Sequence, residues 1–202
     1  MQKQTLSRHF RARTKATGSS PTSRNKVNKF ENKTINLRAP EPEDLDLLYI
    51  WENNTSVWQI SGTLVPFSRF VLKQYLENAG KDIFEMKQLR LIIQLNSNKR
   101  PVGAIDLFDF DPFHSRVGVG ILIADPSDRR KGYAREALET IMTYCFDVLH
   151  LHQIFCNIAS SNSASIKLFT AAGFEVVGEK REWLKNEDGF EGELLLQCVK
   201  KG

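Results

Sequence analysis

Hydrophobic and polar positions follow regular patterns from about residue 34 almost to the end of the chain. Short runs rich in β-branched and aliphatic side chains predict strands, because such side chains suit a half-buried pleated surface. Apolar positions spaced three and four residues apart predict amphipathic helices. The predicted strands span 34–38, 89–95, 102–110, 116–123, 153–159, 175–179 and 190–199. The predicted helices span 44–53, 68–78, 131–149 and 163–172, and residues 55–67 are predicted to form a loop.

This order of elements predicts an α/β (α+β) domain spanning residues 34–202. A chain of 202 residues, 41% apolar and 26% charged, is typical of one soluble globular domain. It contains no apolar run near the roughly 18 residues that a membrane span requires. The three cysteines lack Cys-x-x-Cys spacing, which argues against a zinc site or a disulfide framework and predicts a cytoplasmic protein.

Residues 1–33 differ from the rest of the chain in charge. They hold nine basic residues and one acid, so they carry a net charge of +8, and the remaining residues carry −4. With few large apolar side chains and a Gly-Ser-Ser-Pro-Thr-Ser stretch, the segment is predicted to be a disordered extension. It can be read as a dispensable extension, a transit peptide or an arm that touches nucleic acid. The acidic remainder favours a cationic amine as substrate and argues against nucleic acid as the main partner.

A basic, glycine-containing turn follows the apolar strand at 116–123 and opens the helix predicted after it. The turn reads Arg129-Arg130-Lys131-Gly132-Tyr133-Ala134. The first turn of a helix has unpaired N–H groups and a positive dipole end, so it suits a pyrophosphate. Gly132 would let the backbone approach the phosphates closely. Without its context, the basic run would simply be a solvated helix start.

A second motif lies about 30 residues further along, where Asn162 and Ser165 precede Phe169, Gly173 and Phe174. Taken together and in this order, the two motifs resemble those of the GCN5-related N-acetyltransferase (GNAT) superfamily. The acetyl-CoA signature of that family reads Arg/Gln-x-x-Gly-x-Gly/Ala. The resemblance covers roughly residues 34–200 and implies a central mixed, mostly antiparallel β-sheet flanked by helices.

The resemblance implies acetyl-CoA as co-substrate and predicts no metal. In the family, the pantetheine arm pairs with the fourth strand, which is 116–123 here. The implied cofactor-binding residues are Ile121, Leu122, Ile123, Arg129, Arg130, Lys131, Gly132, Tyr133, Ala134, Asn157, Asn162, Ser165 and Phe169. Two glycines in the strand, Gly118 and Gly120, suggest that a backbone or ligand comes close there. Lys167 is either a solvated helix charge or a contact to the nucleotide phosphates.

Catalysis requires that an amine with an ordinary pKa of about 10.4 lose a proton before it attacks the thioester. Asp106, on the third predicted strand (102–110), is the candidate base, and His114 and Asp109 are its substitutes. The two aspartates can equally lie on a solvated edge of the sheet. Relatives often carry a tyrosine as the acid for the thiolate, where this chain has Phe169. Ser165 or a water could replace it. A glutamate common on the fourth strand is also missing.

The resemblance points to two acceptor classes, polyamines such as spermidine and the N-terminal alanine of ribosomal proteins. The acidic domain favours the polyamine, and the sequence leaves a homo-oligomer open. A catalytically weak acyl-CoA-binding module is a third alternative, because Phe169 cannot donate a proton.

Overall fold

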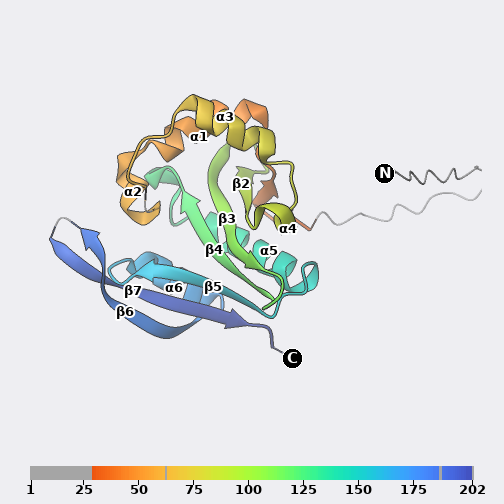
Figure 1. Cartoon of the computed structure of the whole chain (residues 1–202). Helices are drawn as coiled ribbons and strands as arrows, with labels where there is room; N and C mark the ends of the chain where they lie inside the picture. Colours follow the sequence, from red (N-terminus) through yellow and green to blue (C-terminus); the bar gives the residue numbers. More distant parts are fainter. Residues whose placement is uncertain (1–28, 62, 187, 202) are drawn as a thin grey trace, which may run out of the picture.

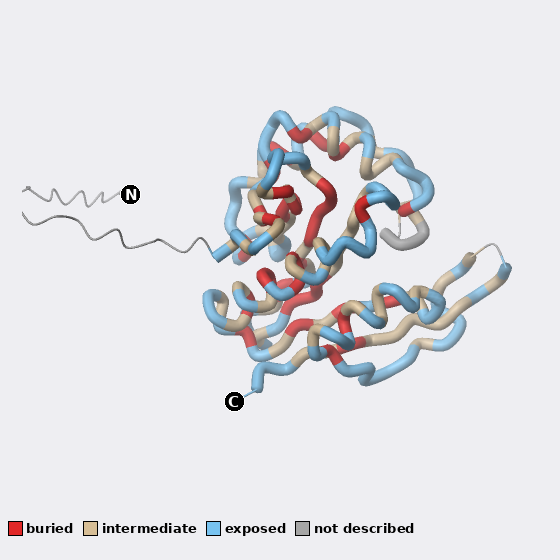
Figure 2. Tube along the Cα trace, turned by 180° about the vertical axis from the view of Figure 1, so that it is seen from behind, coloured by how far each residue is buried: buried red, intermediate tan, exposed pale blue. Residues whose placement is uncertain are grey.

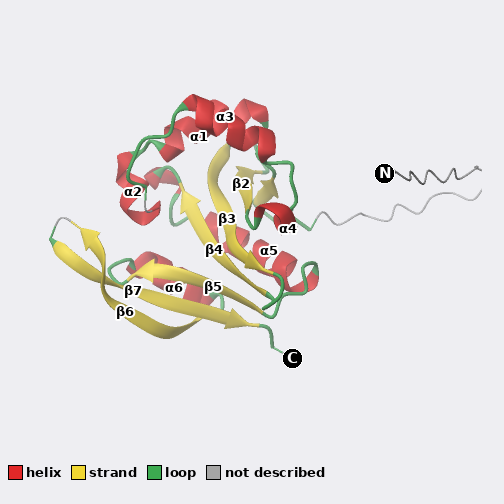
Figure 3. Cartoon of the chain, in the orientation of Figure 1, coloured by secondary structure: helices red, strands yellow, loops and turns green. Residues whose placement is uncertain are grey.

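The computed structural model of the chain describes residues 29–61, 63–186 and 188–201. One seven-stranded mixed sheet carries helices on both faces (Figures 1 and 3). The strand order is β1-β2-β3-β4-β5-β7-β6, in which only β4 and β5 run parallel. The strands are β1 Ile35–Arg38, β2 Leu89–Leu95, β3 Pro101–Asp111, β4 Arg116–Ile123, β5 Gln153–Ala159, β6 Glu175–Asn186 and β7 Gly189–Val199.

Two groups of helices cover the two faces of the sheet. The α-helices are α1 Leu45–Glu52, α2 Thr55–Ser61, α3 Arg69–Asn78, α4 Ile83–Met86, α5 Tyr133–Asp147 and α6 Ser163–Ala171. Short 3-10 turns lie at Pro42–Asp44 and Pro126–Asp128. On one face, Leu48, Leu72 and Leu76 pack on Ile92 of β2. On the other, α5 buries Leu138 and its neighbours against the central strands, where the buried residues gather (Figure 2).

The predicted α+β class and the mixed sheet are confirmed, and β2, β4 and β5 have the predicted bounds. The predicted loop at 55–67 is wrong for its first part, because Thr55–Ser61 is helical, whereas residues 63–67 lie outside any helix or strand. Asn54 accepts a hydrogen bond from the Ser56 amide at 3.1 Å, and the Trp58 indole donates to the Glu52 carbonyl at 2.7 Å. These contacts hold a segment whose own helix propensity is weak.

β6 is longer than predicted. It continues to Asn186 and forms a hairpin with β7 rather than ending at Glu179. As an edge strand it is exposed on both faces for most of its length, so its sequence lacks the alternation that marks a half-buried strand. A break in register between Lys180 and Leu184 further disturbs the pattern.

The predicted extension at 1–33 falls mostly outside the described residues, since the structure describes nothing before residue 29. Residues 29–33, however, already contact the domain. The Phe30 ring lies 5.0 Å from that of Tyr144 on α5, and the Phe30 carbonyl accepts a hydrogen bond from the Leu37 amide at 2.8 Å. The folded part therefore includes residues that the charge pattern assigned to the extension.

Candidate functional site

β4 and β5 are paired at one end and separate toward the other (Figure 3). Their parallel register starts at Arg116 and Gln153 and ends at Gly118 and Phe155. Among the residues that the structure describes, the backbone of 120–123 therefore pairs with β3 alone. An unpaired strand edge can take up an extended, amide-containing ligand as an added strand. The predicted pantetheine contacts lie on this edge: Ile121, Leu122 and Ile123.

The turn that follows β4 brings a helix N-terminus to the same opening. Gly132 directly precedes α5 with φ 87°, and Arg130 also has a positive φ of 62°. Gly132 has no side chain to cap the helix, so the first-turn amides of α5 are available to an anion. An added Cβ at Gly132 would meet no atom within 4 Å, so space at this position is open. The structure thus brings the predicted phosphate residues, 129–134, next to the predicted pantetheine edge.

A buried carboxylate, Asp128, stabilises the turn between β4 and α5. Asp128 is 2% exposed and accepts two hydrogen bonds from the Arg100 guanidinium, at 2.7 and 2.9 Å. Those hydrogen bonds, together with Lys131, lower the pKa of Asp128 to about 2. The Lys131 ammonium lies 3.1 Å from Asp128, and the Arg129 Nε donates to the Ile123 carbonyl at 3.4 Å. Two of the three basic side chains thus shape the turn.

The second motif mainly builds α6. Asn162 caps the helix, because its Oδ1 accepts the Ser165 amide at 3.1 Å. Phe169 is 3% exposed and packs edge-on against Phe174, with ring centroids 5.0 Å apart. The structure therefore gives Phe169 a role in the core, and its predicted contact with the cofactor stays a prediction. Asn157 lies exposed on β5, beyond the last pair with β4.

The glycines of β4 make room for an aromatic ring. A Cβ at Gly118 would lie 2.3 Å from Cε2 of Phe108, which projects from the neighbouring β3. The Phe108 ring in turn contacts Phe155 edge-on, with centroids 5.9 Å apart. The close approach that Gly118 permits is therefore to Phe108, and the expectation of a ligand or backbone at this position is corrected. Gly120 is less crowded, with its nearest atom on Phe108 at 3.7 Å.

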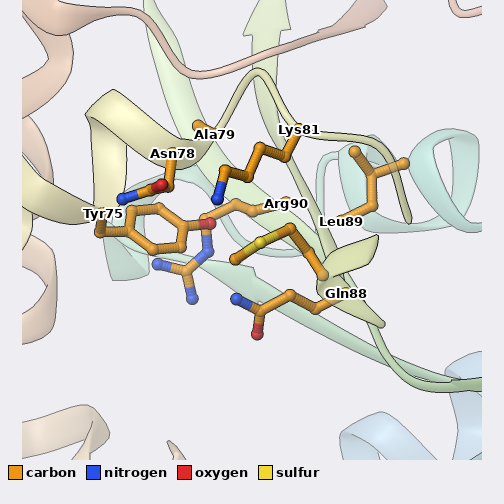
Figure 4. A pocket seen from close by; sticks show the side chains of 8 residues that line it. Tyr75, Asn78, Ala79, Lys81, Gln88, Leu89 and Arg90 are labelled. Carbon is orange, nitrogen blue, oxygen red and sulfur yellow. The ribbon is translucent and has the colours of Figure 1, made fainter. Parts of the chain in front are cut away.

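Asp106 lies opposite Gly120 and takes part in an ion-pair cluster. Its two oxygens accept from Nε and Nη2 of Arg90 at 2.6 and 3.1 Å, and Nη1 of Arg90 pairs with Glu52 at the end of α1. Arg90 also lies over the Tyr75 ring, 5.8 Å from its centroid, beside a hollow between α3, α4 and β2 (Figure 4). Burial opposes the charge of Arg90, but the two carboxylates outweigh it and raise its pKa. The cluster keeps a net negative charge.

His114 is not close to this cluster in the sheet. It lies in the turn before β4, where β4 and β5 are still paired, and Asp106 stands opposite Gly120, further along the strand. Its backbone amide donates to Asp111 at 3.0 Å and its Nδ1 lies 2.7 Å from the same carboxylate, and these two contacts lower the pKa of Asp111 to about 2. Asp109, the other substitute base, is exposed at a bulge with φ 49°. The register of β3 with β4 thus places His114 away from Asp106 along the strands.

Residues 34–175 match the family model of the acetyltransferase (GNAT) domain. The chain belongs to this family. The GNAT domain is 27% identical, over 143 residues, to the spermidine N(1)-acetyltransferase of Vibrio cholerae. That match covers 71% of this chain and 80% of the relative.

Solved structures have the same fold. Spermidine N-acetyltransferase from Vibrio cholerae in complex with CoA and spermine superposes with a TM-score of 0.74 at 22% identity, covering 83% of this chain and 96% of that one. A dodecameric structure of the Vibrio cholerae enzyme gives a TM-score of 0.69 at 24% identity, covering 83% and 95%. At these identities the likeness establishes the fold of the GNAT domain. Within the described residues, no helix is long and apolar enough to cross a membrane.

Sequence reasoning missed the arginines that organise the site. Arg90 and Arg100 bind carboxylates 16 and 28 residues away in the chain, so no local pattern marks them. The one available signal for these arginines was Asp106 itself, because a carboxylate on a strand needs a partner of opposite charge. Among the described residues, no three His, Cys, Asp or Glu side chains are grouped so that they could hold a metal ion.

Proposed function

We propose that this GNAT domain transfers the acetyl group of acetyl-CoA to a primary amine of a polyamine such as spermidine. The observation that carries the proposal is that β4 separates from β5 and that the turn after β4 leads, through Gly132, into the N-terminus of α5. The opening offers an unpaired edge for the pantetheine amides, and the helix offers free amides for the pyrophosphate. The spermidine acetyltransferase relative supports the choice of substrate class.

In this proposal the chain's residues hold the thioester and the amine together. The backbone of 120–123 and Asn157 orient the pantetheine arm, and residues 129–134 bind the pyrophosphate. The amide of Ile121 or Leu122 donates to the oxyanion that forms as nitrogen attacks the carbonyl carbon. The C–N bond forms first and gives a tetrahedral oxyanion; the C–S bond then breaks, and CoA leaves as a thiolate whose pKa of about 8.5 makes protonation optional. Ser165 or a water supplies that proton.

Asp106 is the proposed base. Arg90 uses one acceptor position on each carboxylate oxygen, and each oxygen has a second one, so a water or the amine can still donate to Asp106. Its side chain is 32% exposed. The excess negative charge of Glu52 and Asp106 over Arg90 favours a substrate with more than one positive charge.

The test is CoA release from acetyl-CoA with a panel of acceptors: spermidine, putrescine, a peptide with N-terminal alanine, and an aminosugar. Turnover on spermidine or putrescine, lost in Gly132→Glu, is the expected result. Turnover on the peptide alone would keep the acetyltransferase and replace the substrate class. Tight acetyl-CoA binding without turnover on any acceptor would overturn the proposal in favour of a binding module.

A further inference from the structure

An ammonium group of the chain itself lies in a cluster on the β6–β7 hairpin. Nζ of Lys180 on β6 is 2.5 Å from a carboxylate oxygen of Glu193 on β7 and 3.5 Å from Oδ1 of Asn157 on β5. It also lies over the Trp183 ring, 5.0 Å from the centroid. A carboxylate, an amide oxygen and an aromatic face together are a complete set of contacts for a primary ammonium.

The irregular path of β6 creates this cluster. The register with β7 breaks between Lys180 and Leu184, and Glu182 has a positive φ of 50°. Without the bulge, Lys180 and Trp183, three residues apart, would point to opposite faces of the strand. The bulge instead brings the indole beneath the Lys180 ammonium.

The cluster lies on the sheet face that carries the proposed acetyl-transfer point. Asn157 follows Phe155 by two residues, so their side chains share a face. Phe155 pairs with Gly118 and contacts Phe108, the ring that lies over Gly118. Asp106 precedes Phe108 by two residues on β3 and therefore lies on that face as well. Lys180 thus reaches the β5 side of the opening, and Asp106 lies on the β4 side.

We propose that Lys180 is an internal acceptor, acetylated on Nζ by the protein's own acetyl-CoA. The inference rests on the proposed function, because it needs the thioester in the opening between β4 and β5. Two features support it: Lys180 is the same kind of primary amine as the proposed substrate, and it contacts Asn157, a predicted pantetheine residue. Its side chain is 39% exposed, whereas that of Glu193 is 15% exposed.

The step balances without a further reactant. The Glu193 carboxylate accepts a proton from the Lys180 ammonium, and the free amine attacks the thioester carbonyl. The C–N bond forms, the C–S bond breaks, and CoA takes a proton as it leaves. The net change converts lysine ammonium and acetyl-CoA into acetyl-lysine, CoA and one proton released to solvent. Acetylation removes the positive charge opposite Glu193, leaving that carboxylate open to an external ammonium.

The test is peptide mapping by mass spectrometry after the full chain has been incubated with acetyl-CoA alone. Lys185 is a matched internal control, because it is exposed on the same strand and is open to non-enzymatic acetylation. We expect acetylation of Lys180 to exceed that of Lys185 by at least about tenfold, as enzymatic proton transfer predicts. We also expect the excess to disappear in Gly132→Glu. Equal modification of the two lysines, or an excess that persists in Gly132→Glu, would overturn the inference.

Two further variants separate this inference from the proposed function. Lys180→Arg keeps a cation beside Glu193 but cannot be acetylated, so it should lose the modification and still acetylate spermidine. Glu193→Gln should lower the rate of Lys180 acetylation by about tenfold or more, with its melting temperature recorded to confirm folding. If spermidine is acetylated and Lys180 is not, the internal acceptor fails alone. If no amine is acetylated, the proposed function fails with it.

Discussion

Gly132 is the residue on which phosphate binding most directly depends. It has a φ of 87°, directly precedes α5, and faces open space where a side chain would project. We expect Gly132→Glu to weaken acetyl-CoA binding by at least about 100-fold, because a carboxylate would repel the pyrophosphate beside the α5 amides. Isothermal titration calorimetry measures the effect. Unchanged affinity would remove residues 129–134 from the proposed site.

The control at this position is Gly132→Ala. It shares the cost of a side chain in the left-handed region, about 1–2 kcal/mol, but adds no charge. It should therefore lower the melting temperature while retaining measurable acetyl-CoA binding. If alanine weakens binding as much as glutamate does, backbone strain rather than phosphate repulsion is the cause.

Asp106 has two roles that substitution can separate. As a base it should matter for turnover, and as a partner of Arg90 it should matter for stability. We expect Asp106→Asn to lower kcat by about 100-fold, the usual scale for a missing general base, while acetyl-CoA affinity is unchanged. The acidic limb of the pH–rate profile should also change. A normal profile in Asp106→Asn would assign the proton transfer to another group.

Arg90→Gln is the matched control for that experiment. It removes the ion pairs of Glu52 and Asp106 but keeps both carboxylates, so kcat should fall far less than in Asp106→Asn. The melting temperature should fall in both variants, because Arg90→Gln leaves two partly buried carboxylates without their partner and Asp106→Asn leaves Arg90 with one carboxylate instead of two. A kcat loss as large in Arg90→Gln as in Asp106→Asn would mean that the cluster acts by positioning alone.

At the scale of elements, Asp128 joins the start of β3 to the turn before α5 through Arg100. Its pKa of about 2 lies below the ordinary value near 3.9, so its ionised form stabilises the fold above about pH 4. That contribution is lost as the pH falls from about 4 through about 2. We expect Asp128→Asn to lower the free energy of unfolding at pH 7 by about 1–3 kcal/mol.

Urea unfolding of Asp128→Asn and of the unchanged chain at pH 7, 4 and 3 measures this effect. Asp111 also has a pKa lowered to about 2, but it is present in both proteins, so the difference between them reports Asp128. The difference should be constant near neutrality and shrink below pH 4. A difference that does not change with pH would assign the stabilisation to packing rather than charge.

Elements with strong periodicity were predictable, and those supported by distant contacts were not. β4 and β5 have the predicted bounds, since their apolar runs are bordered by turn residues. α2 is held by the contact of Trp58 with Glu52, and β6 by its pairing with β7. For the site, the motif placed the turn and Gly132, but the partners of Asp128 and Asp106 come from other strands. The spacing of residues along the sequence does not predict those contacts.

At the scale of the whole molecule, the chain combines an acidic domain with a basic start. Residues 34–202 carry a net charge of −4 in a protein whose total is +4. The proposed use of a polycationic substrate depends on the domain, because the ion-pair cluster of Glu52, Asp106 and Arg90 belongs to it. If residues 1–28 instead bind nucleic acid, the affinity of the protein for nucleic acid should fall steeply as the salt concentration rises.

The boundary between these two parts gives the last prediction. Removing residues 1–28 takes away seven of the nine basic residues of the start but leaves Phe30 against Tyr144. This truncation should preserve both the melting temperature and acetyl-CoA affinity. Removing residues 1–33 also deletes Phe30, whose partial burial contributes about 1–2 kcal/mol. The longer truncation should therefore melt about 3–6 °C lower in differential scanning calorimetry. Equal melting temperatures for the two truncations would place the domain boundary at residue 33, and a loss already present on removing 1–28 would place it earlier.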